Sequence, residues 1–367
     1  MGQIAKAGQS LGIPPDQRRG RGAASAVSGR FEPYSREIFD DGWGTLECKT
    51  APLRTTVTPD SSRSVIARNS SPDVPFEQSI NPYRGCEHGC IYCFARPTHA
   101  WLGLSPGLDF ETRLTAKMQA PDLLRKELSR PSYRASPIAL GTNTDPYQPV
   151  ERRLGIMRGI LEVLRDARHP ATIVTKSHLV TRDLDILEDM ARDNLVRVFV
   201  SVTTLDRALA RRMEPRASTP ERRLKAIEAL AIRGVPAGVM VAPVIPALTD
   251  HELEAILDEA QRSGAESAGY ILLRLPHEVK ELFREWLAEH VPDRAERIMN
   301  RVRAMRRGRE NDATFGRRMR GEGLEADLLA LRFRQAVKRL GLNRSHRPLA
   351  TELFRPPRAG QQLCLFE

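Results

Sequence analysis

Three of the five cysteines of the chain lie within one eight-residue stretch, with the spacing C-x3-C-x2-C. Thiolates as close together as Cys86, Cys90 and Cys93 converge on one soft-metal centre. A structural zinc site takes four ligands from the protein, whereas a cubane iron–sulfur cluster with one iron open to a small molecule takes three. The spacing therefore predicts a metal centre with one open coordination position, on a loop that Gly85 and Gly89 allow to turn tightly.

Zinc is the alternative metal for this loop. A zinc knuckle would recruit His88 or His99 as the fourth ligand, because cysteine spacing alone does not separate the two centres. Tyr92, directly before the third cysteine, places an aromatic face beside the open position.

The motif C-x3-C-x-aromatic-C resembles the signature of the radical S-adenosylmethionine (radical SAM) enzymes. The wider run at residues 79–96, SINPYRGCEHGCIYCFAR, resembles their spore photoproduct lyase-like branch. The resemblance implies that Cys86, Cys90 and Cys93 hold a 4Fe–4S cluster whose open iron binds the amino and carboxylate groups of SAM. It also implies that an electron from the reduced cluster, delivered by a flavodoxin or ferredoxin type of donor, splits SAM into methionine and a 5′-deoxyadenosyl radical.

The elements that would position this loop alternate between short β-branched runs and amphipathic stretches, which is typical of a parallel α/β fold. Thr219, Pro220 and Glu221 supply a cap, a proline at the first helical position and an acid in the first turn. Six βα units match the partial (β/α)6 barrel that the resemblance implies. The predicted strands are 80–83, 137–141, 171–175, 196–203, 237–244 and 268–274, and the main helices are 149–167, 181–193, 219–233, 250–263 and 277–290.

Active sites of such barrels lie at the carboxyl ends of the strands. The second strand is followed by a polar run at residues 141–151, for which an Asx turn at Asp145 is the alternative explanation. The resemblance places the amino group of SAM here, with Thr142 and Thr144 as contacts. Lys176 ends the third strand and suits the SAM carboxylate, unless it extends to solvent.

Two further strands end in polar residues. Ser201 is surrounded by β-branched residues and needs a partner. The resemblance suggests the ribose or carboxylate of SAM, and a core serine bonded to the backbone is the alternative. Arg274 closes the sixth strand as a candidate clamp for a substrate anion. Arg216, two residues after Glu214, is interpreted as part of a structural ion pair.

One residue departs from the branch that the chain resembles. Spore photoproduct lyases carry a cysteine at the end of the second strand as hydrogen-atom donor, and this chain has Thr142 there. A threonine hydroxyl is a far poorer hydrogen-atom donor than a thiol, which argues against repair of the spore lesion itself. Tyr147 and Tyr92 are the candidate radical relays.

The net charge of +11, from 57 Lys and Arg against 46 Asp and Glu, is unevenly distributed. Residues 291–367 carry 18 basic and 9 acidic side chains. This excess predicts a polyanion partner such as DNA or RNA, and a solvated arginine-rich surface is the alternative. Residues 291–345 are predicted to form a basic helical extension, with helices at 294–306 and 324–340 that cap the open side of the barrel.

The two ends of the chain differ from the core in composition. Residues 1–55 predict a loosely ordered tail, residues 56–290 the barrel, and residues 346–367 a flexible tail. This tail ends in Gln362-Leu363-Cys364-Leu365-Phe366, which resembles the bacterial sliding-clamp-binding motif; a strand that folds back onto the barrel is the alternative. The sequence contains no run of about 18 apolar residues, so no membrane span is predicted. The start lacks the apolar segment of a secretory signal. The cysteine pattern fits a reducing cytoplasm.

Together these patterns favour a radical SAM enzyme that repairs or modifies a base or sugar of nucleic acid. Two alternatives stay open: the same chemistry on a small molecule or a protein, and a zinc-dependent nucleic-acid-binding module without catalysis.

Overall fold

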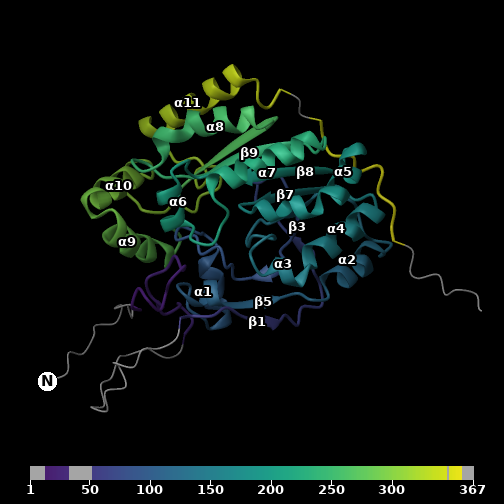
Figure 1. Cartoon of the computed structure of the whole chain (residues 1–367), viewed down its shortest axis with the longest axis horizontal. Coiled ribbons are helices and arrows are strands. Elements are labelled where there is room, and N and C mark those ends of the chain that lie inside the picture. The colour runs from purple at the N-terminus through teal and green to yellow at the C-terminus, as the bar shows by residue number, and fades with distance from the viewer. Residues whose placement is uncertain (1–12, 33–51, 345–346, 358–367) are drawn as a thin grey trace, which may run out of the picture.

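The computed structural model describes residues 13–32, 52–344 and 347–357. Within these residues the chain forms an α/β fold around one seven-stranded, mostly parallel sheet (Figure 1). The strands are parallel except for the edge strand β2, which is antiparallel to its neighbour. Their order across the sheet is β10 (Ser267–Leu272), β9 (Ala237–Val244), β8 (Val196–Ser201), β7 (Ala171–Thr175), β6 (Ile138–Leu140), β3 (Gln78–Ile80) and β2 (Ala67–Arg68).

Helices cover this sheet, and the longer ones are amphipathic, with an apolar stripe at helical spacing. In α4, for example, Ile160 and Leu164 are fully buried, as is Ile173 on β7. None of the described helices combines the length and the hydropathy that a bilayer span requires. The helices of this layer are α2 (Ala120–Leu128), α3 (Glu151–Leu154), α4 (Ile156–Asp166), η3 (His178–Asp183), α5 (Leu184–Arg192), α6 (Arg207–Met213), α7 (Pro220–Ile232), η4 (Asp250–Glu252) and α8 (Leu253–Arg262).

The predicted barrel is confirmed as an α/β fold with a parallel sheet, with local differences. The predicted helix at 149–167 is two helices, because Gly155 adopts a left-handed conformation (φ 65°) between α3 and α4. The predicted cap is present, since the Thr219 side chain accepts a hydrogen bond from the Arg222 amide at the start of α7. Helix α2 was not predicted, and its apolar face packs against α4.

A second, three-stranded sheet lies next to the cysteine loop. Its strands are in the order β1 (Thr56–Pro59), β5 (Arg113–Ala116) and β4 (Tyr83–Arg84). Strand β4 leads directly into the loop, and the chain continues through the 3-10 helix η2 (Arg96–Leu102) and the short helix α1 (Asp109–Thr112) before it enters β5.

The C-terminal segments lie on both edges of the main sheet. After α9 (Val279–His290) and α10 (Pro292–Ala304), residues 308–323 run beside β10, where the Leu272 amide donates to the Met319 carbonyl at 2.8 Å. Arg318 in this segment pairs with Asp73, which lies between β2 and β3. The segment therefore connects the first and last strands of the open sheet. Helix α11 (Leu324–Leu340) then packs outside α8 (Figure 1).

Residues 13–32 differ from the predicted tail, because they pack onto the core. Ala23 is fully buried, and the amides of Gly22 and Ala23 donate to the two carboxylate oxygens of Glu111 at 2.9 Å each. Composition concealed this contact, since small residues and glycine are what such a close approach to a carboxylate requires.

The same carboxylate forms a buried ion pair with Arg96, the first residue of η2. The Arg96 Nη2 atom lies 2.5 Å from the Glu111 Oε1 atom, and both side chains are fully buried. The guanidinium also donates to the carbonyls of Gly89 and Cys90 in the cysteine loop, at 3.2 and 2.9 Å, and to the carbonyl of Gly107 at 2.9 Å. One arginine therefore fixes the backbone of the cysteine loop.

We expect Glu111→Gln to lower the free energy of unfolding by about 3–5 kcal/mol, because it leaves the Arg96 charge buried without a counter-ion. Urea unfolding of the reduced, metal-free protein measures this loss.

Glu289→Gln is the matched control, since Glu289 pairs with Arg18 of the same N-terminal segment at the surface, 2.7 Å apart. This exposed pair predicts a loss below about 1 kcal/mol. Equal losses in the two variants would contradict the role assigned to Glu111.

Candidate active site

The cysteine loop lies at the carboxyl end of the parallel sheet and turns at two glycines with positive φ. Gly85 has φ 79° and Gly89 has φ 67°. A Cβ atom on Gly89 would come within 2.7 Å of Glu111 Oε2, and one on Gly85 within 2.8 Å of the Phe110 carbonyl oxygen. Both positions therefore require glycine, for conformation and for space.

The three thiols of this loop are close enough to influence one another. Cys86 and Cys90 are buried and Cys93 is partly exposed. Burial raises the pKa of all three thiols, and a nearby carboxylate raises it further for two of them, Asp145 for Cys86 and Glu214 for Cys90. The thiols therefore stay protonated at neutral pH until a cation displaces their protons.

The backbone around the loop presents amides to the sulfurs. The nearby backbone amide of Asp145 lowers the pKa of Cys86, and those of Ala95 and Arg96 lower the pKa of Cys93. Three thiols, two of them with backbone amides nearby, fit a 4Fe–4S cluster that takes three ligands from the chain. Among the described residues, no group of three or more His, Cys, Asp and Glu side chains is arranged around a single metal ion.

The two histidines considered as a fourth ligand each contact another group. His88 Nδ1 lies 3.4 Å from Asp145 Oδ2. The Nε2 atom of His99 lies 3.0 Å from the Arg113 carbonyl oxygen, and its ring contacts Phe110 edge to face.

Asp145 connects three segments at the mouth of the barrel. Its carboxylate accepts hydrogen bonds from the Thr175 hydroxyl and the Lys176 amide, both at 2.7 Å, and from the Tyr147 amide at 2.9 Å. The last bond closes the Asx turn that the sequence offered as an alternative. Although burial opposes it, His88 together with these hydrogen bonds lowers the pKa of Asp145 to about 2, so the carboxylate stays ionised.

The two predicted threonines of the β6 loop differ in availability. Thr144 is buried and its hydroxyl donates to the Tyr83 carbonyl at 2.8 Å. Thr142 is partly exposed, and its hydroxyl accepts from the Asn81 side chain at 3.2 Å. Asn81 also accepts from the amides of Asn143 and Thr144. The loop is thus held by Asn81, a residue that the sequence analysis did not select.

Lys176 points across the mouth rather than along the surface. Its Nζ atom donates to the Ala242 carbonyl on β9 at 3.3 Å and lies 5.8 Å from the centroid of the Tyr92 ring. Burial lowers the pKa of Lys176, and the negative charge of Cys90 opposes this shift. The ammonium group is therefore placed between the cysteine loop and the opposite strand.

A buried polar chain continues from Tyr92 into the core. The Tyr92 and Thr203 hydroxyls lie 3.2 Å apart, and Thr203 donates to Glu214 at 2.9 Å. Glu214 forms a fully buried ion pair with Arg223. Sequence reasoning missed Thr203 and Arg223, although a threonine directly after a β-branched strand was the available signal.

Ser201 adjoins these buried polar residues, whereas Tyr147 contacts a different group. Ser201 is the last residue of β8 and is buried, and its carbonyl accepts from Arg223 at 3.1 Å. Tyr147 is fully buried, but its hydroxyl donates to Asp183 at 3.1 Å and its ring lies under Arg182. The part of Tyr147 as a radical relay stays a prediction.

Two more arginines of interest have partners near the loop. Arg216 pairs with Glu87, within the cysteine motif, at 2.9 Å, so the expected ion pair exists but not with Glu214. Arg274 stacks over Phe94, the residue after the third cysteine, with 5.1 Å between its Cζ atom and the ring centroid.

Many arginines of the C-terminal extension are neutralised within it. Arg301 pairs with Glu325, Arg303 with Glu310, and Arg307 with Glu322. These pairs give three of the arginines a partner within the extension and leave its net excess of basic residues unchanged. The clamp-like pentapeptide at Gln362–Phe366, Cys48 and Cys364 lie outside the described residues.

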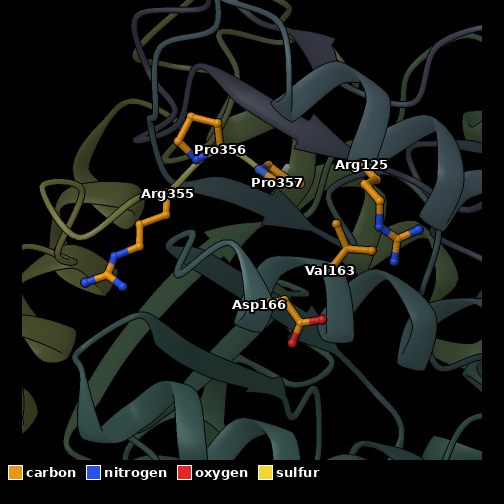
Figure 2. Close-up of a pocket in the computed structure, with 6 residues that line it drawn as sticks. All are labelled: Arg125, Val163, Asp166, Arg355, Pro356 and Pro357. Atoms are coloured by element: carbon orange, nitrogen blue, oxygen red, sulfur yellow. The ribbon is translucent and has the colours of Figure 1, made fainter. Parts of the chain in front are cut away.

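A surface pocket of about 300 Å³ lies away from the cysteine loop (Figure 2). Arg125 and Asp166 belong to α2 and α4, and Arg355 closes the third side. The Arg355 amide donates to the carbonyl of Ala167, which precedes β7. The pocket therefore lies near the amino end of the strands. None of the predicted site residues lines it.

Comparisons with known proteins agree with this geometry. The family model "Radical SAM superfamily" matches residues 80–260. An uncharacterized protein of Mycobacterium tuberculosis (strain ATCC 25618 / H37Rv) is 41% identical over 238 residues, which is 64% of this chain and 69% of that protein. An uncharacterized protein of Methanocaldococcus jannaschii is 26% identical over 61% of this chain and 80% of its own length.

Solved structures show the same fold. A spore photoproduct lyase complexed with dinucleoside spore photoproduct superposes with a TM-score of 0.57 at 18% identity, over 78% of this chain and 80% of that one. A variant of the lyase with bound AdoMet and the same dinucleoside gives a TM-score of 0.57 at 17% identity and the same coverage. The chain therefore belongs to the radical SAM superfamily, whose cofactors are a 4Fe–4S cluster and S-adenosylmethionine.

Proposed function

We propose that this protein is a radical SAM enzyme that repairs or modifies a base or sugar of nucleic acid. The observation that carries the enzymatic part is the set of three thiols on one loop, two buried and one partly exposed, at the carboxyl end of a parallel sheet and next to Lys176 and Tyr92. When bound, the cluster supplies the electron that cleaves SAM into methionine and a 5′-deoxyadenosyl radical. A flavodoxin or ferredoxin type of protein is the proposed source of that electron.

In this mechanism the residues of the chain bind and orient the cluster and SAM. Cys86, Cys90 and Cys93 hold the cluster. Lys176 supplies a positive charge for the SAM carboxylate, while the β6 loop with Thr142 and the end of β8 at Ser201 border the same space. Burial of these groups excludes water, which matters because an exposed radical would be quenched.

The nucleic-acid part of the proposal is supported by separate observations. The C-terminal segments place an excess of basic residues beside β10, and Arg274 lies against Phe94 next to the third cysteine. The structurally similar lyase was solved with a dinucleoside. Because Thr142 stands where those lyases are expected to have a cysteine, we propose a different reaction from repair of the spore lesion. The ion pairs within the extension favour the alternative, a small-molecule or protein substrate.

Replacement of any one loop cysteine by alanine should abolish the cluster. We expect the wild-type protein, purified anaerobically and reconstituted, to hold about four iron atoms per chain and to form 5′-deoxyadenosine from SAM and a strong reductant. Iron analysis and chromatography of the nucleoside measure both properties. Cys364→Ser is the control and should retain them; zinc in place of iron would refute the proposal.

We expect Lys176→Met to raise the KM for SAM in uncoupled 5′-deoxyadenosine formation by about tenfold or more, because a charged hydrogen bond contributes about 1.5–3 kcal/mol. Lys225→Met removes the same charge at an exposed position of α7 and should change the KM little. A KM that stays at the wild-type value in Lys176→Met would show that another group binds the carboxylate.

Binding to nucleic acid should be detectable at low salt by gel shift with single-stranded and duplex DNA and RNA. We expect the logarithm of the affinity to fall linearly with the logarithm of the salt concentration, because phosphate contacts release counterions. The absence of salt-sensitive binding to all of these probes would leave the small-molecule or protein alternative.

A further inference from the structure

Two arginines meet at the carboxyl end of the last strand, beside the cysteine loop. Arg274 follows β10 by two residues and stacks over Phe94, whose side chain is 43% exposed. Arg306 lies just beyond α10, is only 2% exposed, and donates through Nη2 to the carbonyl of Leu273, the residue before Arg274. Segments from the barrel and from the extension thus bring two guanidinium groups to one place.

These guanidinium groups have N–H donors without acceptors. Among the described residues, the buried Nε and Nη1 atoms of Arg306 and the Nε atom of Arg274 have no hydrogen-bond partner. The exposed arginines of the same extension contrast with them, since Arg301, Arg303 and Arg307 all pair with glutamates. In the extension and its border with the barrel, the unsatisfied donors thus belong to Arg306, which is buried, and to Arg274, which is partly buried.

Nearby acids do not complete this pair. Asp73 binds Arg318 through both carboxylate oxygens, and Asp312 accepts from the Thr314 amide. Burial, and next the charge of Arg274, lower the pKa of Arg306 to about 10, while Asp312 opposes the shift. Like charges with unpaired buried N–H groups are costly, so the arrangement calls for an anion.

We propose that Arg274 and Arg306 bind a phosphate group of the substrate, with Phe94 as the stacking face for the attached base. A planar guanidinium fork matches phosphate oxygens in bidentate geometry, and aromatic faces stack bases of any sequence. Because Phe94 directly follows Cys93, a substrate held here lies beside the proposed cluster. This inference rests on the proposed function and adds the group by which the substrate is recognised.

The first experiment tests the anion site on the full-length reconstituted protein with inorganic phosphate as the probe. Phosphate should raise the thermal midpoint above that in chloride at equal ionic strength, since a ligand that binds only the folded state stabilises it. We expect Arg274→Gln and Arg306→Gln each to weaken phosphate binding about tenfold or more. Arg307→Gln removes the same charge at an exposed neighbouring position and should bind phosphate like the wild type.

The design keeps the test valid if Arg306 is needed for folding. Arg274 is only partly buried, so Arg274→Gln tests the same site from its open side. In chloride, Arg306→Met should unfold no earlier than the wild type, because it removes a buried charge that forms no ion pair with a carboxylate among the described residues. An earlier midpoint in chloride, together with unchanged phosphate binding by Arg274→Gln, would overturn the inference.

The second experiment distinguishes the sources of the phosphate. Fluorescence anisotropy compares a short single-stranded oligonucleotide, the same sequence with neutral methylphosphonate linkages, and thymidine 5′-monophosphate as a competitor. We expect Arg274→Gln and Arg306→Gln to weaken binding of the phosphodiester strand about tenfold and to affect the neutral strand little.

The two proposals fail separately. Phosphate binding that depends on both arginines, without binding of any oligonucleotide, would support the anion site and reject nucleic acid as the substrate. Oligonucleotide binding that is indifferent to both arginines would reject the site and leave the proposed function intact. Competition between phosphate and SAM in uncoupled cleavage would overturn the assignment to substrate, because the arginines would then serve the SAM carboxylate.

Discussion

The active site depends on one buried ion pair, between Arg96 and Glu111. A guanidinium is the only side chain with enough donors in one plane to satisfy a carboxylate and the carbonyls of Gly89, Cys90 and Gly107 together. A carbonyl oxygen that pointed toward a thiolate would repel it. By accepting hydrogen bonds from Arg96, the carbonyls of Gly89 and Cys90 are directed toward the guanidinium group. A buried pair contributes little net stability, so we infer that its role is to specify the shape of the loop.

Features that depend on neighbouring residues were predictable from the sequence. The cysteine spacing is local, and it led to the family. Strands β7 and β9 and helix α11 have the predicted bounds, because a β-branched run or a long apolar stripe determines each of them without distant partners. Lys176 was selected for the same reason, since a lysine at the end of a buried strand has only the mouth or the solvent to enter.

Features that depend on distant partners were not predictable. The roles of Asn81, Asp145 and Arg223 arise from contacts with residues brought close only by the sheet order. The surroundings of Tyr147 were likewise not predictable, since its place in a polar loop does not determine the direction of the ring, whose hydroxyl donates to Asp183. Residues 13–32 looked like a tail because a carboxylate that recruits backbone amides needs glycine and alanine, which composition alone assigns to disorder.

The sheet order also separates the two cationic regions of the mouth. Lys176 follows β7 and Arg274 follows β10, and strands β8 and β9 lie between them. The Glu214–Arg223 ion pair lies near the end of β8 and adds no net charge to the region between Lys176 and Arg274. A carboxylate on one side and a phosphate on the other therefore need not compete for one cation. This separation favours SAM and a phosphorylated substrate occupying the mouth together, which radical transfer between them requires.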